Sequence, residues 1–558
     1  MFKRFKTLRK VLAKVFVPVY LASSITTVPE YLRKRFGRER ISIYIAFITL
    51  TMYAILKIAI NVYSGALFIE MVTGWSKYAS IFSLLLVTCS ISIAGGLTAV
   101  MYIDALQAML MIVGAFILFG VCLKEAGVNS LESFQLAYLN TAYNLDEVRS
   151  EFNFTENYNS NLSKLYQKCA PPPDETSFKL LRPIHDTTSP WLPWLVGCNA
   201  VSLWYWCTDQ LMVQRTLSAK SKFHAQMGAL FACACKFMPL VFMIIPGMLA
   251  RILFPSEVAC IPGEHCEEVC GNPHGCANFA FPLLIVRILP SGLKGLLSAV
   301  MIAALMSDLE SIFNSAATLF TIDIWIKLRP KSSQSELVFV GRLIVVVLTI
   351  WAILWIPVID AQSSGQLFFY GQEVANYLTP PIGAAFLLAV TWKGANECGT
   401  FWGMTTGTIL GLIRLIMMIS IGEATCSLEE NRPWWSKVHF LTYSSIIFIT
   451  TLVTIIIVSK LSKSENLPNL NELETFEDND DNEISIFDSE EPVISTSKNW
   501  RLFDKVLNLY QRHTDPMPSK KQEVKVNLEL STGQSRLINC VAAFLLLFYF
   551  ILILVLSL

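Results

Sequence analysis

Three adjacent aromatic residues with polar neighbours lie inside a long apolar segment of this chain. Residues 203–210 read Leu-Trp-Tyr-Trp-Cys-Thr-Asp-Gln, within an apolar run that starts near Trp191 and stops at Arg215. A helix that faces lipid gains little from so many hydrogen-bonding groups at one level. Aromatic rings stack on the C–H face of a sugar, and amides or hydroxyls bind its hydroxyl groups. The stretch therefore predicts a polar cavity within a membrane, shaped for a flat hydroxylated solute.

Other apolar runs offer polar groups of the same kind at mid-depth. Tyr205 and Trp206 supply rings in the first stretch, and Gln372 supplies an amide in another run. Pro380 and Pro381, further along that second run, would break its helix. Transporters often interrupt helices at the level where they bind solute. These residues together predict a solute site built from several spans.

Ionisable residues within spans are costly to bury and are candidates for function. Asp104 lies near the start of one apolar run, and Lys236 stands in the middle of another, close to Pro239. Asp308 and Glu310 share a single helical turn. The alternative explanation is snorkelling or an internal pair, and Pro239 would free a backbone carbonyl that could hold Lys236.

Oxygen-bearing side chains recur along one stripe of the helix predicted around Asp308. Ser307, Ser311 and Ser315 are spaced by four residues, and Asp308 lies beside them. A hard cation such as Na⁺ takes oxygen ligands, by the same chemistry as Mg²⁺ and Ca²⁺. Small serines also let membrane helices pack closely, which is the competing explanation.

No stretch combines a nucleophile with a base, a metal-ligand set or a phosphate loop, so an enzyme is not expected.

The composition indicates an all-α polytopic membrane protein. Of 558 residues 53% are hydrophobic and 16% are charged, with a mean hydropathy of +0.50, whereas soluble domains carry about 25% charged residues. The net charge of +1 argues against a nucleic-acid partner.

A spanning helix needs about 20 apolar residues. The runs that meet this test are 42–72, 77–96, 100–123, 191–214, 224–253, 279–326, 337–358, 364–390, 399–420, 438–459 and 536–557. Pro282, Pro290, Gly292 and Gly295 predict that 279–326 is a short piece followed by a full span from about Leu296.

The distribution of charge predicts which loops face the cytoplasm. If the basic cluster 33–40 is cytoplasmic, alternation puts the other Lys/Arg-rich loops on the same side, which is the positive-inside pattern. The loops near 124–190 and 254–278 then face outward. The first of these carries sequons at Asn153 and Asn161, which we expect to be glycosylated. Residues 461–533 form an acidic cytoplasmic linker before a final span at 534–558.

Four cysteines crowd the outward loop near 254–278. Their spacing, C-x5-C-x3-C-x5-C, is unusual for zinc, and an oxidising compartment favours two disulfides instead.

The first 24 residues are basic and amphipathic, with an apolar patch too short to cross a bilayer. They form an interfacial helix or the remnant of a span.

Taken together, these stretches resemble the animal sodium/glucose cotransporters of the sodium:solute symporter family. The likeness runs from about Val15 to Lys460. It implies an inverted-repeat, LeuT-like transporter core with the solute near the midplane. Because the chain begins where the second core helix of the family is ending, the resemblance implies that the first core helix is missing. The sequence is then either a fragment, which we favour because the remaining sites look maintained, or a variant that does not transport alone. The matching stretches are 28–37, 95–100, 203–210, 213–215, 312–315 and 364–368.

The resemblance assigns roles in solute binding by position. It implies that Tyr205 is an inner aromatic gate and that Trp206 stacks on the sugar. Lys236 and Gln372 correspond to partners of the sugar hydroxyls, and Ser202 to a lesser partner. The implied activity is sodium-coupled symport of glucose or a related monosaccharide or polyol across the plasma membrane, by alternating access. An accessory membrane subunit cannot be inferred from the sequence.

The resemblance also assigns a sodium site, where this chain departs from the family. Ala304, Ser307 and Asp308 fall where a core helix helps to bind Na⁺, and Asp104 corresponds to a carboxylate near the sodium exit path. Asp308 stands where the family has a serine ligand, and Glu310 is also atypical. A carboxylate there could bind Na⁺ or take a proton, so two alternatives stay open. They are proton-coupled symport through Asp308 and a sugar-gated sensor or cation conductance without net transport.

Three external disulfides are implied by the same likeness. They pair Cys260 with Cys266, Cys270 with Cys276, and Cys169 with Cys426.

Overall fold

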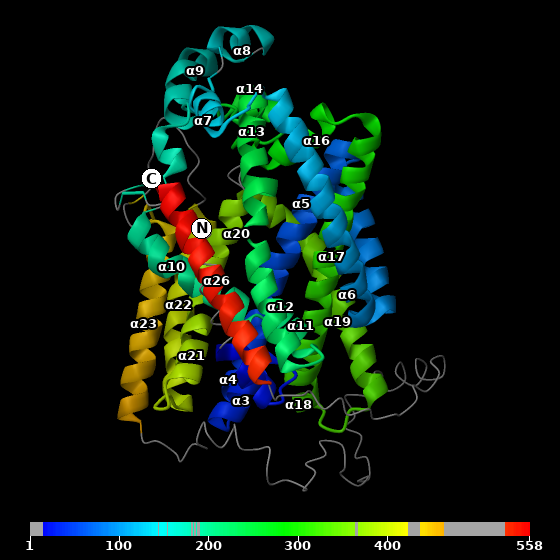
Figure 1. The fold of residues 1–558 in the computed structure, drawn as a ribbon, viewed down its shortest axis with the longest axis vertical. Coiled ribbons are helices and arrows are strands. Elements are labelled where there is room, and N and C mark those ends of the chain that lie inside the picture. Colours follow the sequence, from blue (N-terminus) through cyan, green and yellow to red (C-terminus); the bar gives the residue numbers. More distant parts are fainter. Residues whose placement is uncertain are drawn as a thin grey trace.

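The protein is described by a computed structural model that covers most of the chain. The described residues are 15–142, 144–152, 154–179, 182–183, 186, 190–362, 367–421, 433, 436–462 and 531–557. They form an elongated bundle of helices (Figure 1). Within this part of the chain the only β-type pairing is an isolated bridge between Arg182 and Pro190. The expected all-α class is therefore confirmed.

The helices of the first half alternate long apolar segments with short polar ones. Long apolar runs become helices because helices alone satisfy their backbone groups within lipid. In order, they are α2 (Val17–Ala22), α3 (Val28–Phe36), α4 (Arg40–Met52), the π-helix η2 (Tyr53–Ile58), α5 (Ala59–Thr73), α6 (Lys77–Glu125), α7 (Leu131–Leu139), α8 (Leu145–Glu151), α9 (Glu156–Cys169), the 3₁₀-helix η3 (Glu175–Phe178), α10 (Trp191–Leu203), the π-helix η4 (Trp204–Thr208) and α11 (Gln210–Leu217).

The second half continues in the same way. Its elements are α12 (Lys222–Cys235), the π-helix η5 (Leu240–Ile244), α13 (Ile245–Leu253), α14 (Pro255–Val258), α15 (Glu264–Cys270), the 3₁₀-helix η6 (Ala277–Phe279), α16 (Ala280–Ile288), α17 (Ser291–Phe320), the π-helix η7 (Thr321–Trp325), α18 (Ile326–Leu328), α19 (Gln334–Gln362), α20 (Leu367–Leu378), α21 (Pro380–Thr391), α22 (Glu397–Ile421), α23 (Phe440–Leu461) and α26 (Thr532–Ser557).

Fewer uninterrupted helices than the predicted runs are long and apolar enough to cross a membrane. Among the described residues there are 7, and the pair α20–α21, bent by 49°, makes up to 8. The predicted runs that are not among these spans are 77–96, 191–214 and 536–557. Two runs are also divided in the structure. The run 191–214 is interrupted at Asp209, where the backbone is extended. The run 279–326 divides into α16 and α17 as predicted, but the break lies at Leu289–Pro290 rather than near Leu296.

Helix α6 joins the two predicted runs 77–96 and 100–123 in one element of 49 residues. Its early part contacts α5, where Leu84 lies against Gly65. Its late part belongs to the buried cluster that contains Phe68 and Leu118. The roughly 34 residues from Leu84 to Leu118 would span about 50 Å if α6 were straight. Helix α6 is therefore not straight. It turns back on itself, because Leu84 meets Leu305 of α17 at Gly65 while Asp104 bonds to Ser307, two residues further along α17.

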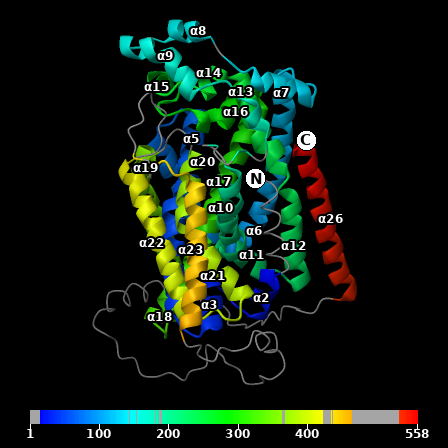
Figure 2. The same ribbon diagram turned by 90° about the vertical axis from the view of Figure 1, so that its left-hand side faces the viewer.

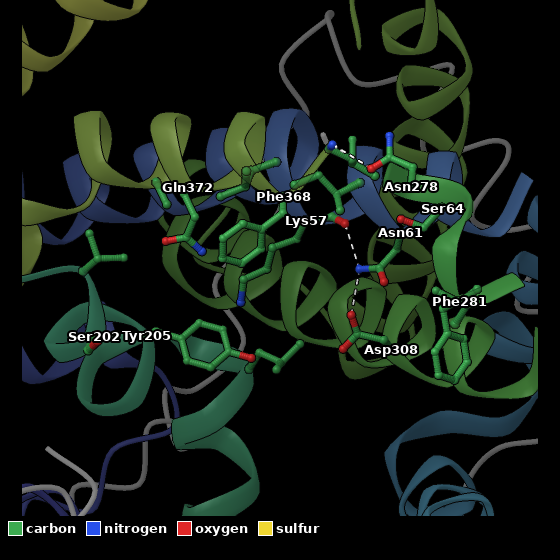
Figure 3. Close-up of a pocket in the computed structure, with 18 of the residues that line it drawn as sticks. Lys57, Asn61, Ser64, Ser202, Tyr205, Asn278, Phe281, Asp308, Phe368 and Gln372 are labelled. Carbon is green, nitrogen blue, oxygen red and sulfur yellow. Dashed lines mark hydrogen bonds between the residues drawn. The ribbon is translucent and has the colours of Figure 1, made fainter. Parts of the chain in front are cut away.

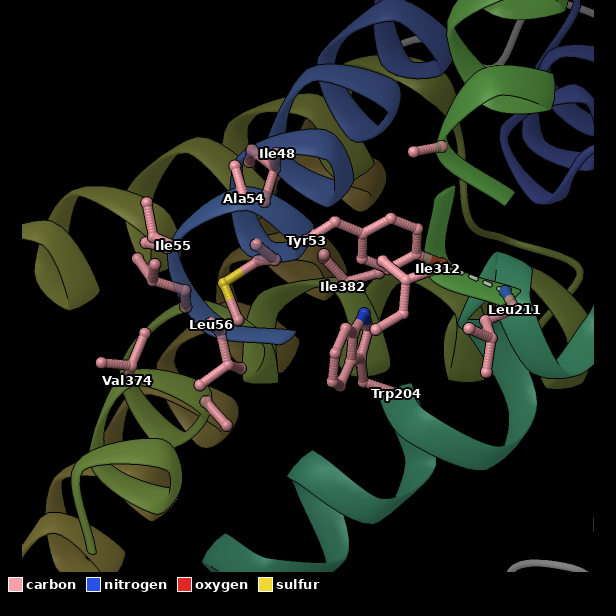
Figure 4. Packing of buried hydrophobic residues seen from close by; sticks show 14 of the residues in the cluster. Ile48, Tyr53, Ala54, Ile55, Leu56, Trp204, Leu211, Ile312, Val374 and Ile382 are labelled. Atoms are coloured by element: carbon pink, nitrogen blue, oxygen red, sulfur yellow. Dashed lines mark hydrogen bonds between the residues drawn. The ribbon is translucent and has the colours of Figure 1, made fainter. Parts of the chain in front are cut away.

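The centre of the bundle is tightly packed where the irregular helices meet. Tyr53 of η2 and Trp204 of η4 are almost fully buried, and they lie with Ile312 of α17 and Ile382 of α21 in one apolar cluster (Figure 4). π-helical turns are rare and occur often at functional sites. The hydroxyl of Tyr370 connects α20 to the π-helix η2, since it donates to the carbonyl of Ile55 at 3.3 Å.

The last helix, α26, lies at the edge of the bundle against α12 (Figure 2). Leu230 of α12 packs with Ile538, Ala542 and Leu545 of α26 in a separate small cluster. The predicted final span is therefore a peripheral helix attached to α12, which ends just before Lys236. The expected linker 461–533 lies almost entirely outside the described residues, as do residues 1–14 of the expected basic N-terminus.

One end of the bundle carries a compact polar layer, which we call the cap and define as α8, α9 and residues 260–276 (Figure 1). The structure pairs Cys260 with Cys266 and Cys270 with Cys276, which is the pairing that the family resemblance implied. Cys169 at the end of α9 is disulfide-bonded as well. Its expected partner, Cys426, lies outside the described residues.

The two parts of the cap are held together by hydrogen bonds. The backbone N–H of Thr155 donates to Glu264 Oε2 at 2.8 Å, and the Tyr158 hydroxyl donates to the carbonyl of Ile261 at 3.0 Å. Gly263, at φ +109°, lies so close to the Tyr158 ring that a Cβ would approach it to 2.5 Å. Glycine is required here by both the backbone conformation and the contact.

The sequons fall in this layer. Asn161 lies in α9, and its side-chain amide donates to the carbonyl of Asn157 at 3.0 Å. Asn153 lies outside the described residues. Glycosylation at both positions stays a prediction.

His265 lies at the centre of the cap. It is fully buried between the rings of Phe152 and Phe154, with centroid distances of 5.1 and 5.9 Å. Its Nδ1 accepts the backbone N–H of Ile261 at 3.2 Å, which requires that nitrogen to be unprotonated. Burial lowers the pKa of His265 from 6.5 to about 4.

Acidification is expected to loosen the cap. In the unfolded cap, His265 takes up a proton at its ordinary pKa of 6.5, whereas in the folded cap it does so only near pH 4. Between these values the unfolded state binds more protons than the folded state. The free energy of unfolding of the cap therefore falls as the pH falls. The loss reaches about 3 kcal/mol at the lower end of that window. Hydrogen exchange of residues 260–276, corrected for intrinsic rates, should accelerate from pH 7 to 4. The variant His265→Gln, which keeps an acceptor without titrating, should flatten this dependence; an unchanged slope would contradict the assignment.

Candidate functional site: a cavity at the helix breaks

A cavity of about 750 Å³ lies where the broken and irregular helices converge (Figure 3). Helix α10 with η4, α5 with η2, and the helices α17 and α20 all contribute side chains. The cavity is mainly apolar with a few convergent polar groups, the usual make-up of a ligand site. Six of the residues singled out from the sequence line it, namely Ser202, Tyr205, Trp206, Lys236, Asp308 and Gln372.

The rings of the opening sequence motif lie on one wall of this cavity. Tyr205 and Trp206 are edge to face, with centroids 4.7 Å apart. The ammonium group of Lys236 lies 4.9 Å from the centroid of the Trp206 ring. A cation at this distance is attracted by the ring quadrupole, which helps to orient the lysine. Trp206 is almost fully buried, whereas Tyr205 is half-buried.

A buried ion pair spans the break in the helix that carries these rings. Lys57 of η2 forms a salt bridge with Asp209, whose side chain is 0% exposed. Tyr53 also donates its hydroxyl to Asp209 Oδ1 at 2.5 Å. The Lys57 ammonium lies 5.3 Å from the ring centroid of Trp204 and 5.0 Å from that of Tyr205. Because Asp209 sits at the non-helical residue between η4 and α11, the pair fixes the aromatic wall to η2.

Sequence reasoning missed Lys57, Tyr53 and Asp209. The signal was present, since Lys57 is a lysine inside the apolar run 42–72, the same criterion that selected Lys236. Asp209 belongs to the aromatic motif at 203–210, and its position there does not indicate which cation pairs with it. Pairing across more than 150 residues leaves no pattern in local spacing.

The far side of the cavity is formed by polar side chains of α5, α17 and η6. Asn61 donates from Nδ2 to Asp308 Oδ2 at 2.7 Å (Figure 3). Asn278 accepts the backbone N–H of Leu367 at 3.0 Å, which connects η6 to the first residue of α20. Gln372 lies on this same helix α20. Ser64, Phe281 and Phe368 complete this region of the lining.

The residues assigned to a sodium site do not converge at one point. Ser307 donates to Asp104, and Arg215 forms an ion pair with Asp104 at 2.6 Å. Arg215 also donates to Ser311. Asp308, one residue on, faces the cavity instead, since neighbouring residues of a helix point about 100° apart. Ala304 and Ser307 are half-buried in α17 and do not belong to the cavity lining.

The predicted sodium residues are thus divided between two sides of α17. A network of Asp104, Ser307, Ser311 and Arg215 lies on one side, and the Asp308–Asn61 pair lies on the other. Their assignment as sodium ligands stays a prediction. The arrangement places one guanidinium group against the Asp104 carboxylate, which neutralises that charge within the bundle.

Comparison with known proteins decides the family. The profile of the sodium:solute symporter family matches residues 5–407. The chain belongs to the sodium:solute symporter family. This is a family of transporters and not of enzymes, as the sequence led us to expect.

Two curated members of the family illustrate the likeness. Sodium/myo-inositol cotransporter 2 of Homo sapiens is 44% identical over 443 residues, which cover 79% of this chain and 63% of that protein. Sodium/myo-inositol cotransporter of Canis lupus familiaris is 42% identical over 445 residues, or 80% of this chain and 60% of that protein. The chain therefore spans less than two thirds of the length of these relatives. The expected glucose-specific subgroup is not specifically supported.

A solved structure supports the fold of the family. It shows a Na⁺-coupled sialic acid symporter in a substrate-bound, outward-open state, and it matches with a TM-score of 0.58. The match covers 84% of each chain at 18% identity. This likeness confirms the LeuT-like architecture that the symporter family implied.

Removing the cation of the buried pair is expected to destabilise the protein strongly. The variant Lys57→Met leaves the Asp209 carboxylate buried without its partner, at a cost of about 3–5 kcal/mol. Thermal unfolding of the purified protein in detergent measures the effect. The double variant Lys57→Met/Asp209→Asn should recover much of the loss, because no lone charge is left buried. Lys460→Met, at an exposed position of α23, is the matched control. Equal unfolding temperatures for Lys57→Met and Lys460→Met would refute the structural role.

Proposed function

We propose that the protein carries out sodium-coupled symport of a cyclic polyol by alternating access. The main support for this proposal is the cavity at the helix breaks. An aromatic wall and separate polar groups surround a space there that is large enough for a monosaccharide or cyclitol. Family membership and the names of the curated relatives support the coupling to Na⁺. Each Na⁺ that enters contributes about 2.3 kcal/mol per 100 mV of membrane potential.

The class of substrate is narrowed by what lines the cavity. Trp206 and Tyr205 provide flat apolar surfaces for the C–H face of a ring, and Ser202, Lys236 and Gln372 provide donors and acceptors for hydroxyl groups. These groups suit a six-membered ring with many hydroxyls. Since the curated relatives above are named as myo-inositol cotransporters, we propose myo-inositol or a close cyclitol ahead of glucose. The plasma membrane is the proposed location.

Sodium-dependent uptake tests this function directly. Cells that express the full chain should accumulate labelled myo-inositol when Na⁺ is present, and more readily than labelled glucose. Replacing Na⁺ by choline should reduce the uptake to that of cells without the protein. Uptake that is unchanged in choline would refute sodium coupling. Sugar-induced current without accumulation of label would support the sensor alternative and refute transport.

Substitutions in the cavity should weaken substrate binding more than they weaken folding. Trp206→Ala removes the stacking surface and Gln372→Ala removes an amide, each costing about 1–2 kcal/mol of binding. The KM for the polyol should rise about tenfold for each variant. Trp351→Ala is the matched control, because Trp351 is an exposed tryptophan of α19 outside the cavity lining. A rise in KM that is equal in all three variants would show that the cavity is not the binding site.

A further inference from the structure

The first residue of helix α20 is capped by a side chain from a distant part of the chain. Leu367 is buried, at 6% exposed, and the first N–H groups of a helix have no partner within that helix. Asn278 of η6 supplies the partner, because its Oδ1 accepts the N–H of Leu367 at 3.0 Å (Figure 3). Asparagine is among the preferred residues for capping the start of a helix, and here it comes from 89 residues earlier in the chain.

The position of Asn278 is itself fixed by the cap. The short helix η6 begins directly after Cys276, which is buried and forms a disulfide with Cys270. The N–H of Phe279 donates back to the carbonyl of Cys276 at 3.0 Å. The side chain of Asn278 therefore projects from a tight turn that a disulfide anchors to the cap.

One face of α20 carries Gln372 into the cavity. Leu367, Phe368, Gly371, Gln372 and Ala375 all line the cavity, which is the spacing of a single helical face. Within the described part of the chain, the side-chain amide of Gln372 has no hydrogen-bond partner. Its place in the cavity is therefore set by the position of α20 and not by hydrogen bonds of its own.

Other contacts hold α20 at its middle and leave its start to Asn278. The hydroxyl of Tyr370 donates to the carbonyl of Ile55, and a Cβ at Gly371 would approach the Ile60 side chain to 2.7 Å. These contacts set the distance between α20 and the η2–α5 segment. The capped residue precedes Gln372 by five positions, which is about 7.5 Å along the helix axis. The cap bond thus holds the end of the helix from which Gln372 is reached.

From this geometry we infer that Asn278 is a positioning residue for the substrate, because it sets where the Gln372 amide meets a substrate hydroxyl. The inference rests on the proposed function, in which Gln372 binds the polyol. Asn278 lines the same cavity, but its acceptor oxygen is committed to the start of α20. It therefore acts through the helix and connects the disulfide-bonded cap to the binding site.

A double-mutant cycle tests this role in uptake by the full chain at saturating Na⁺. Asn278→Ala should raise the KM for labelled myo-inositol by at least about threefold and at most the tenfold or so expected for Gln372→Ala. The double variant should show only the rise of Gln372→Ala, because the position of an absent amide no longer matters. Independent contributions would multiply to about thirtyfold or more. The kcat per transporter at the cell surface should stay within about twofold.

Two substitutions of similar size test the chemistry of the bond. Asn278→Asp keeps an oxygen acceptor and removes both N–H donors, and Asp caps a helix as well as Asn, so its KM should stay within about twofold of the unmodified value. Asn278→Leu removes the acceptor at similar volume and should raise the KM as Asn278→Ala does. Asn199→Ala, in α10 and outside the cavity lining, is the matched control and should leave the KM unchanged.

The outcomes separate this inference from the proposed function. Absence of sodium-dependent uptake of myo-inositol by the unmodified protein would refute the function itself. If uptake is present, an unchanged KM in both Asn278→Ala and Asn278→Leu would refute the positioning role, even if less protein reached the cell surface. A rise in KM that multiplies with that of Gln372→Ala and persists in Asn278→Asp would also overturn it, and would make Asn278 a direct ligand of the substrate.

Discussion

The buried contact between Lys57 and Asp209 is the interaction on which the cavity depends. A helix that stops in the middle of a membrane leaves backbone groups and any nearby charge without water. Here the break at Asp209 is stabilised by a lysine and a tyrosine hydroxyl from η2. Because the same residues touch the rings of Trp204 and Tyr205, the break and the aromatic wall are held as one unit. A cavity with a few convergent polar groups can then persist within an apolar bundle.

Helix α17 separates two kinds of chemistry across its width. Towards one side, Ser307 and Ser311 join Asp104 and Arg215 in a compact polar network. Towards the cavity, Asp308 pairs with Asn61. The two groups lie on different faces of one continuous helix, so a rotation or translation of α17 would move both of them together.

The sequence predicted the membrane class, most of the spans and six residues of the cavity lining. It succeeded at Trp206 and Gln372 because their chemistry is out of place in lipid. It failed at Lys57 and Asp209, because a salt bridge between distant segments leaves no local pattern. The predicted runs 77–96 and 100–123 correspond to the apolar segments Lys77–Ile93 and Met101–Glu125, but the sequence did not predict that helix α6 continues between them. Apolar length indicates that a segment is buried in lipid, but not where its helix bends.

Hydrophobicity and backbone hydrogen bonding within single segments are enough to predict the helices and the polar residues that lipid would reject. Which of those polar residues meet depends on how the helices pack against one another. Ser307 and Asp308 are adjacent in the chain and face different partners, whereas Asn61 and Asp308 are 247 residues apart and share a hydrogen bond. The reason is physical: the direction of a side chain is set by helix rotation, and helix rotation is set by packing against the neighbouring helices.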